Sequence, residues 1–174
     1  DLKNDNEVDK LIKNYDLIFS LHCKQLFPKL LVNSIKCINI HPGYNPINRG
    51  WFPQVFAIIN NIELGVTIHE IDEKLDHGPI IDRIKVPLYE WDTSLIAYNR
   101  VLLAEIDLLR KNLMEIINNN YKTVRMENGG NIFLKKDFDE ICEIDLDKTS
   151  TYRDVINHLR ALTHGDYNNA FFYT

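Results

Sequence analysis

Cysteine is scarce in this sequence, and no two cysteines stand at the spacing of a metal-binding or redox motif. The 174 residues include three of them, Cys23, Cys37 and Cys142. An odd number without a Cys-x-x-Cys pair argues against both a disulfide framework and a zinc ribbon. We therefore expect the cysteines to be buried free thiols.

Long apolar runs and an excess of basic residues are also missing. No stretch approaches the roughly 20 apolar residues that span a bilayer, and Asp1 to Asp9 is polar and acidic rather than a secretory signal. The formal charge is -5, and the basic residues are scattered, which argues against DNA or tRNA as the main partner. We expect a soluble, cytoplasmic protein with no nucleic-acid or membrane partner. A substrate with a few phosphates is compatible with this charge.

What the sequence does contain is a succession of short apolar runs and helical patterns. Asp16 to Leu21 and Cys37 to Ile40 are apolar runs on either side of Leu26 to Ser34, which indicates a strand-helix-strand unit. Gly65 to Ile71 and Ile80 to Val86 alternate at period two and predict two paired strands. With 45% apolar and 26% charged residues, the composition fits one main α/β domain with a small appendage.

Two helices are predicted in the second half of the chain. Asp92 to Asn120 should hold the longest helix, with polar residues available as its N-cap. Its core face is predicted from apolar residues at helical spacing, namely Leu95, Tyr98, Leu102, Ile106, Leu109, Leu113 and Ile117. Thr151 to Asp154 fits the capping box of a short terminal helix that Gly165 closes.

The most informative segment is Asn39-Ile-His-Pro-Gly43, at the end of an apolar run. Alternate residues of a strand point to the same side, so Asn39 and His41 face one site. Pro42 keeps His41 extended, and Gly43 allows the chain to turn away at once. Open α/β sheets bind their ligands at such strand ends. A lone histidine here is more often a capped or solvated residue, so the assignment needs a second signal.

That signal is the acidic loop from Asp72 to Pro79, in which Asp76 comes shortly before a Gly-Pro turn. A carboxylate placed against an imidazole raises the imidazole pKa and fixes its orientation. A neighbouring amide can donate to a developing oxyanion. Asn39, His41 and Asp76 together are therefore a candidate constellation for acid–base chemistry.

At these residues the chain resembles the folate-dependent formyltransferases, a family that includes glycinamide ribonucleotide transformylase, methionyl-tRNA formyltransferase and the sugar N-formyltransferases. The matching pieces are Asn39 to Gly43 and Gly65 to Ile81, and the likeness extends from Asp16 to Ile117. In the family the matching asparagine, histidine and aspartate are catalytic. The resemblance therefore implies that Asn39, His41 and Asp76 are the catalytic residues.

The resemblance also implies the fold. Residues 1–120 are expected to form a partial Rossmann-like catalytic core that lacks the first strands found in family members. Residues 121–174 are expected to form a small C-terminal segment that ends in a short helix. A homodimer is compatible with this family, and no metal is implied.

Within the family, Asn45 to Phe56 looks most like the enzymes that formylate a nucleotide-linked amino-dideoxy sugar, typically dTDP-4-amino-4,6-dideoxyglucose, for surface polysaccharides such as the O-antigen. Arg49 can meet a diphosphate, Trp51 can stack on a base or sugar, and amide side chains can address hydroxyls. The substrate-binding residues expected on this basis are Tyr44, Asn45, Asn48, Arg49, Trp51 and Gln54. Packing against the following helix is an alternative role for Trp51, Phe52 and Phe56.

The formyl donor that the resemblance implies is N10-formyltetrahydrofolate. Family members bind its pterin through backbone groups of the segment that aligns with Leu21 to Leu26 and of the acidic loop. The residues expected to contact it are Leu21, Cys23, Leu26, Ile71 and Glu73.

Two hypotheses from other classes stay open. His41, His69, Asp76 and His77 could ligate one metal ion of a hydrolase, although the sequence has no His-x-x-x-His or cysteine pair. A folate- or nucleotide-binding remnant without activity is the second. Within the family, the negative charge disfavours a tRNA substrate and the Asn48-Arg-Gly-Trp-Phe52 segment disfavours the purine enzyme.

Overall fold

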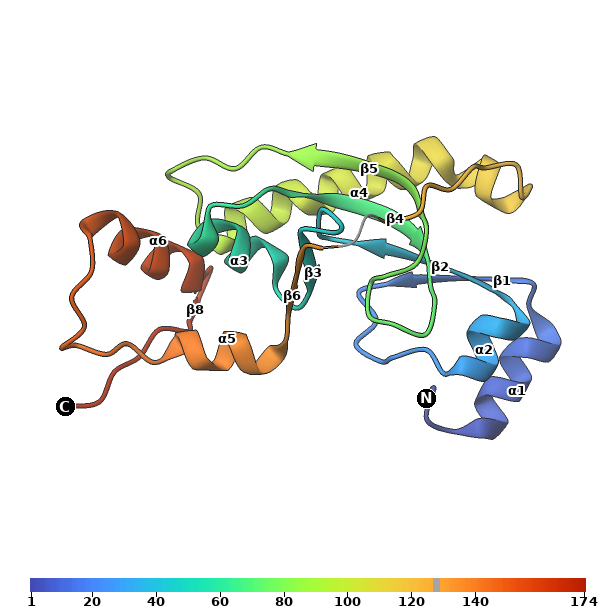
Figure 1. Ribbon diagram of the computed structural model, residues 1–174, viewed down its shortest axis with the longest axis horizontal. Helices are drawn as coiled ribbons and strands as arrows, with labels where there is room; N and C mark the ends of the chain where they lie inside the picture. Colours follow the sequence, from blue (N-terminus) through green and yellow to red (C-terminus); the bar gives the residue numbers. More distant parts are fainter. Residues whose placement is uncertain (127–128) are drawn as a thin grey trace.

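A four-stranded sheet lies at the centre of the structure, a computed structural model that describes residues 1–126 and 129–174 (Figure 1). Its strand order is β1-β2-β4-β5. β1 and β2 run parallel, whereas β4 is antiparallel to both β2 and β5. The strands are β1 (Leu17–Leu21), β2 (Lys36–His41), β4 (Leu64–Glu70) and β5 (Ile80–Val86). The predicted strand-helix-strand unit and the predicted pair of strands are both confirmed.

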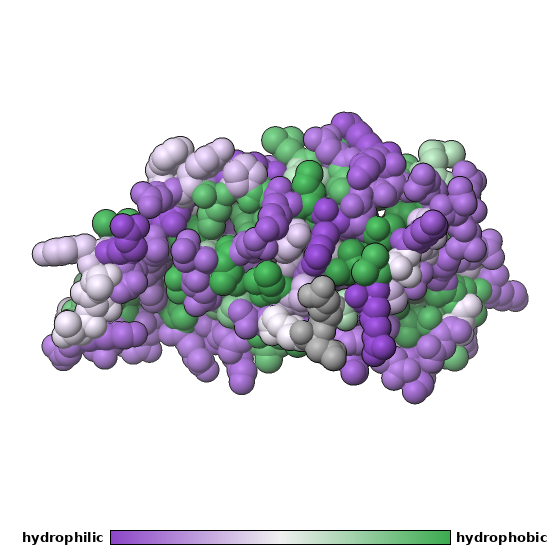
Figure 2. Space-filling view, turned by 45° about the horizontal axis from the view of Figure 1, so that its top comes forward, coloured by the Kyte–Doolittle hydropathy of each residue, from purple (hydrophilic) through white to green (hydrophobic). Residues whose placement is uncertain are grey.

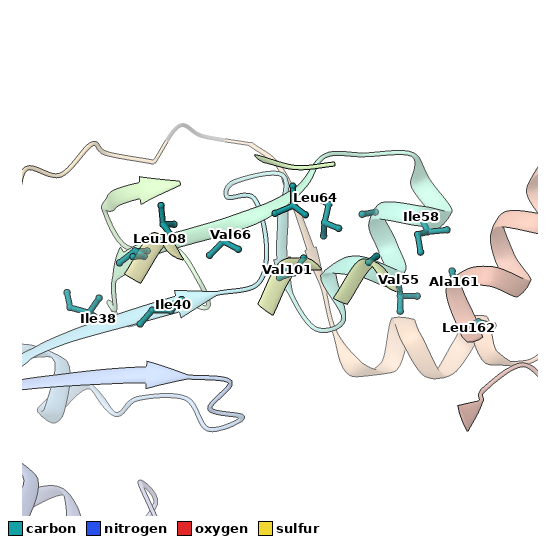
Figure 3. Packing of buried hydrophobic residues seen from close by; sticks show 14 of the residues in the cluster. Ile38, Ile40, Val55, Ile58, Leu64, Val66, Val101, Leu108, Ala161 and Leu162 are labelled. Atoms are coloured by element: carbon teal, nitrogen blue, oxygen red, sulfur yellow. The ribbon is translucent and has the colours of Figure 1, made fainter. Parts of the chain in front are cut away.

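Helices cover the two faces of this sheet, which gives the mixed α/β fold that was expected. On one face lie α1 (Asp5–Asn14) and α2 (Lys29–Ser34), packed around Val8, Leu31 and Cys37. The other face packs against α4 (Ser94–Ile117), with α3 (Pro53–Asn60) beside it. Figure 3 shows side chains of β2, β4 and α4 meeting in this larger core.

The long helix was predicted correctly, but its buried face was not. Predicted core residues Ile106 and Ile117 are exposed, and the buried face is shifted by one residue along the helix. This face carries small or polar side chains as well as large ones, namely Ser94, Ala97, Val101, Glu105, Leu108, Asn112 and Ile116. Small residues let a helix approach a sheet closely, and a pattern of the largest apolar residues misses them.

Figure 2 shows apolar residues scattered among polar ones on the face that it presents.

The C-terminal segment joins the first part of the chain through a second small sheet. β3 (Asn48–Gly50) pairs in parallel with β6 (Asn131–Phe133), a strand that was not predicted. α5 (Lys135–Cys142) and α6 (Tyr152–Leu162) follow, and then the hairpin of β7 (Thr163–His164) and β8 (Tyr167–Asn168). The division into residues 1–120 and 121–174 stays a prediction.

The terminal helix has the predicted capping box, because the Asp154 backbone N–H donates to Thr151 Oγ1 at 3.1 Å. Gly165, however, lies in the hairpin turn with φ +60° and does not close the helix. Cys37 and Cys142 are buried as expected, whereas Cys23 is exposed, so the expectation for Cys23 was wrong. Among the described residues, no helix is long and apolar enough to span a membrane.

Candidate active site

The structure brings Asn39, His41 and Asp76 into contact. Asn39 and His41 are alternate residues at the carboxyl end of β2, and Asp76 lies in the loop between β4 and β5. Asn39 Nδ2 donates a hydrogen bond to Asp76 Oδ1 at 3.1 Å, and His41 Nδ1 lies 3.6 Å from Asp76 Oδ2. The antiparallel register sets Glu70, the last residue of β4, opposite Ile38, so the loop starts beside the middle of β2 and turns back to bring Asp76 to Asn39 and His41 (Figure 1). We call these three residues, which the sequence predicts to be catalytic, the catalytic cluster.

His41 is enclosed and held in one orientation. Only 4% of the residue is exposed, and Nε2 lies 3.1 Å from the Asn48 carbonyl oxygen. Because a carbonyl only accepts, Nε2 carries the proton, and the lone pair of the neutral ring is on Nδ1 beside Asp76. A Cβ at Gly43 would lie 2.3 Å from His41 Nε2 and 2.1 Å from the Asn48 oxygen. Glycine at position 43 therefore makes room for the imidazole.

The surroundings of the cluster favour a neutral imidazole beside an ionised carboxylate. Burial lowers the pKa of His41, and the opposing effect of Asp76 does not restore it. Burial alone would raise the pKa of Asp76, but His41, His69 and the Gly50 amide together lower it to about 2. At neutral pH, His41 is therefore able to accept a proton, and Asp76 is a fixed negative charge.

His69 belongs to the same group, although the sequence suggested it only as a metal ligand. It pairs with Asn39 across β2 and β4 and is 1% exposed. Its Nδ1 lies 2.7 Å from the Glu70 carbonyl oxygen, and its Nε2 lies 3.3 Å from Asn39 Nδ2 and 3.6 Å from Asp76 Oδ1. The available signal was a histidine at an inward position of an apolar strand, but its partner depends on strand register.

The backbone at Asp76 has a left-handed conformation, with φ +44°. Aspartate tolerates this region better than most side chains do. Gly50 N–H donates to Asp76 Oδ2 at 3.0 Å, and the Asn45 side chain donates to the Asp76 carbonyl oxygen at 3.1 Å. The segment after β2 thus holds both the carboxylate and the backbone of Asp76.

A cleft of about 630 Å³ opens at this end of the sheet. Trp51 and Gln54, two of the predicted substrate-binding residues, line it, and Lys24 Nζ lies 5.8 Å from the centre of the Trp51 ring. The cleft is lined further by residues of the loop after β1, by the catalytic cluster and by Gly50, Phe52, Ser94, Tyr98, Leu134, Phe138, His164, Tyr167 and Asn169.

The other predicted substrate-binding residues do not line the cleft. Asn45 and Asn48 are fully buried, and the Asn48 side chain donates to the Pro53 carbonyl oxygen at 2.7 Å, so both brace the site within the protein. Tyr44 lies instead under Arg83, whose guanidinium carbon is 4.7 Å from the ring centre. Arg49 Nε is buried without a hydrogen-bond partner among the described residues. Sequence order could not tell which side of the segment each side chain faces.

A smaller recess of about 60 Å³ adjoins the cleft. Four of the residues predicted to bind the folate line it, namely Cys23, Leu26, Ile71 and Glu73. The fifth, Leu21, is exposed and lines neither cavity. Asn39 and Asp76 line both the recess and the cleft, as do Cys23, Gln25, Leu26 and Leu75, and these shared residues form the border between the two cavities.

The C-terminal segment contributes one wall of the cleft, which the sequence did not indicate. Phe138 of α5 packs on Phe52, with ring centres 4.2 Å apart. His164 of the hairpin lies with Nδ1 3.1 Å from Ser94 Oγ, and Ser94 in turn accepts from Gln54 Nε2 at 3.2 Å. Residues distant in sequence therefore meet in one polar network at the cleft.

The metal hypothesis gains no support from the geometry. Across residues 1–126 and 129–174, no group of three or more histidine, cysteine, aspartate or glutamate side chains could hold a metal ion. His77 bonds Asp72 instead, with 2.6 Å between Nδ1 and Oδ2.

A histidine, an amide and a carboxylate lie at the end of a sheet strand, beside two adjoining cavities, and this arrangement is suited to group transfer. Comparison with known proteins defines its class: residues 2–113 match the family described as formyl transferase, and the chain belongs to this family. Residues 137–174 match the N-formyltransferase dimerization C-terminal domain. The chain is therefore an N-formyltransferase by family.

The relatives include a dTDP-sugar formyltransferase and, at lower identity, methionyl-tRNA formyltransferases. The chain is 46% identical over 165 residues to the dTDP-4-amino-4,6-dideoxyglucose formyltransferase of Mycobacterium tuberculosis, covering 95% of this chain and 70% of the relative. A 4-N formyltransferase from Francisella tularensis has 47% identity and a TM-score of 0.95, over 100% of this chain and 71% of that one. An N-formyltransferase from Helicobacter canadensis was solved with folinic acid and dTDP-3-aminofucose. It has 30% identity and a TM-score of 0.72, over 87% of this chain and 58% of that one.

Proposed function

We propose that this chain transfers a formyl group from N10-formyltetrahydrofolate to the amine of a nucleotide-linked amino-dideoxy sugar, dTDP-4-amino-4,6-dideoxyglucose. The observation that carries the proposal is the contact of Asn39, His41 and Asp76, of which Asn39 and Asp76 line both cavities and His41 lines the cleft. Donor and acceptor must approach such a cluster from different sides, and the two cavities provide these approaches. The names of the relatives support the choice of acceptor.

We assign the pterin end of the donor to the side of the smaller recess, whose volume of about 60 Å³ has room for only a part of the folate. Leu26 and Ile71 offer apolar walls, and Asn39 and Asp76 close the recess where the reacting group must lie. When bound, the folate supplies the activated formyl group. The expected roles of Cys23 and Glu73 in holding it remain part of the proposal.

Each member of the cluster has a task that follows from its position. Asn39 holds side-chain N–H groups at the border of the cavities, where one can donate to the formyl oxygen as negative charge develops. His41 relays a proton from the attacking to the leaving nitrogen, since its imidazole is neutral at rest. Asp76 stabilises the imidazolium form of His41 and orients it, because Nδ1 carries a proton in that form.

The direct test is formyl transfer by the purified chain, with mass spectrometry of the sugar product. dTDP-4-amino-4,6-dideoxyglucose should be formylated in the presence of N10-formyltetrahydrofolate, and the free amino sugar should react far more slowly. A UDP-linked amino sugar serves as the comparison for nucleotide preference. Absence of a formylated product with every amino sugar would contradict the proposal.

Lys24 is the lysine that lines the cleft, so we expect it to contact the diphosphate of the acceptor. Lys24→Ala should raise the KM for the nucleotide sugar about fivefold with kcat unchanged, because a contact made equally in ground and transition states contributes uniform binding. Initial rates at varied sugar concentration measure this. Arg49→Ala is the matched control, and a larger rise in KM for Arg49→Ala would restore the role that the sequence suggested for Arg49.

We also propose a cytoplasmic homodimer formed through residues 137–174, which match a dimerization domain. The outer side of α6 exposes Val155, Ile156 and Leu159, an apolar set suited to a second copy. Ile156→Asp should convert the dimer to a monomer in sedimentation at micromolar concentration. Arg153→Asp, also on α6 and exposed, is the control, and a dimer that survives Ile156→Asp would place the interface elsewhere.

A further inference from the structure

A second histidine–carboxylate pair lies at the cleft, outside the catalytic cluster. His22 directly follows β1, and the parallel register that sets Leu21 opposite Ile40 leaves His22 at the same sheet end as His41. His22 Nε2 lies 3.0 Å from Glu105 Oε2 of α4, and the imidazole also meets Tyr98 edge-on, with ring centres 6.1 Å apart. His22, His41 and Tyr98 all line the cleft.

Glu105 is unusual because it occupies the buried face of α4 and is only 5% exposed. One carboxylate oxygen bonds His22, and the other, Oε1, is buried with no hydrogen-bond partner in residues 1–126 and 129–174. Burying a carboxylate that is only partly compensated costs free energy, and an apolar side chain would pack this face at lower cost. A carboxylate kept in such a place near a cleft points to a chemical task.

The pair has the arrangement of a base and its orienting group. Glu105 as a carboxylate only accepts, so Nε2 of neutral His22 carries the proton and the lone pair is on Nδ1. The His22 side chain is 38% exposed, whereas that of His41 is 5% exposed and has both nitrogens beside protein atoms. His22 is therefore the more accessible of the two imidazoles for a proton that arrives with a ligand.

We propose that His22, oriented by Glu105, takes the proton that the acceptor ammonium must lose before its nitrogen can attack. This inference rests on the proposed function, in which the acceptor is an amine. An amine with a pKa of about 8 is mostly protonated at neutral pH, so it must lose a proton before it attacks. One ammonium N–H bond breaks, and the proton forms an N–H bond at His22 Nδ1. The freed electron pair forms the bond to the formyl carbon, and the bond from that carbon to N10 breaks. A second amine proton passes through His41 to N10, and the third stays on the product amide.

The charges around His22 agree with this role. Glu105 and Tyr98 face it from α4, His41 lies at the end of the adjacent strand, and Lys24 is in its own loop. The hydrogen bond to Glu105 raises the pKa of His22, against the opposing effect of burial. Burial, and then Glu105, raise the pKa of Tyr98, so its hydroxyl stays neutral. The imidazolium that forms is balanced by Glu105 and can return its proton to solvent.

The test is the pH dependence of kcat/KM for the amino sugar in wild type, His22→Asn and Glu105→Gln. At pH 7, His22→Asn should be about 10-fold slower than wild type, since only the free-base fraction of an amine with a pKa of about 8 then reacts. By pH 9 this deficit should nearly vanish, because the amine loses its proton in solution. In Glu105→Gln the acidic limb should move to lower pH, since loss of the carboxylate lowers the pKa of His22.

His158→Asn is the matched control, because this imidazole of α6 bonds the Ile141 carbonyl oxygen and does not line the cleft. Its pH profile should equal that of wild type. A loss in His22→Asn that is equal at every pH, or no loss at all, overturns the inference while leaving the proposed function intact. An inactive wild type contradicts the proposed function instead. Should His22→Asn not fold, His22→Gln gives the same comparison.

Discussion

Asp76→Asn should lower the turnover number for formyl transfer by a factor of 10² or more, roughly the usual value of acid–base catalysis, while the protein stays folded. The carboxylate contacts Asn39, His41 and His69 at once, so its loss removes the charge that orients and stabilises the protonated His41. Asparagine tolerates the left-handed conformation of position 76 as well as aspartate does. His41→Asn should give a loss of the same order. Steady-state kcat and the thermal midpoint Tm measure activity and folding separately.

Asp82→Asn provides the control for Asp76→Asn. Asp82 accepts from Lys111 and Asn112 at 2.8 Å and 2.9 Å, away from the cleft lining, so its turnover should equal that of wild type. Wild-type turnover in Asp76→Asn or in His41→Asn would remove the residue concerned from the mechanism.

Asn39→Ala should lower turnover by roughly 10² to 10³, the usual effect of losing one donor to a developing oxyanion. The amide now donates to Asp76 at 3.1 Å and lies 3.3 Å from His69, at the border of cleft and recess. Because the donation strengthens as charge develops, the loss should fall on kcat more than on KM. Single-turnover rates with donor and acceptor both saturating isolate this step. A variant that changes only KM would show that Asn39 binds substrate without stabilising the transition state.

That Asn39, His41 and Asp76 lie together could be predicted from the sequence, because the signals are local. Asn39 and His41 are two residues apart on one strand, and the rule that alternate residues share a face needs no knowledge of tertiary structure. The acidic loop around Asp76 lies between two alternating segments whose pairing was also predicted. Resemblance to a family then assigned the roles.

What the sequence missed depends on register and on packing between distant segments. His69 joins the cluster because β4 pairs with β2 so that His69 lies opposite Asn39. Glu105 was not predicted as a site residue, because the apolar pattern of α4 predicted a buried face that is shifted by one residue from the one observed. His164 reaches the cleft only through the fold of the C-terminal segment, more than 50 residues beyond the nearest predicted site residue.

The close approach at Gly43 constrains how such a chain can evolve. A methyl group there would stand 2.1 Å from the Asn48 carbonyl oxygen and 2.3 Å from His41 Nε2, so every single substitution must displace either the backbone or the imidazole. The usual gradual route, in which a tolerated replacement is followed by a compensating one, has no first step at this position. Substitutions in the residues that line the cleft can change the acceptor preference one at a time. The turn at Gly43 can change only together with His41 and Asn48, which it contacts.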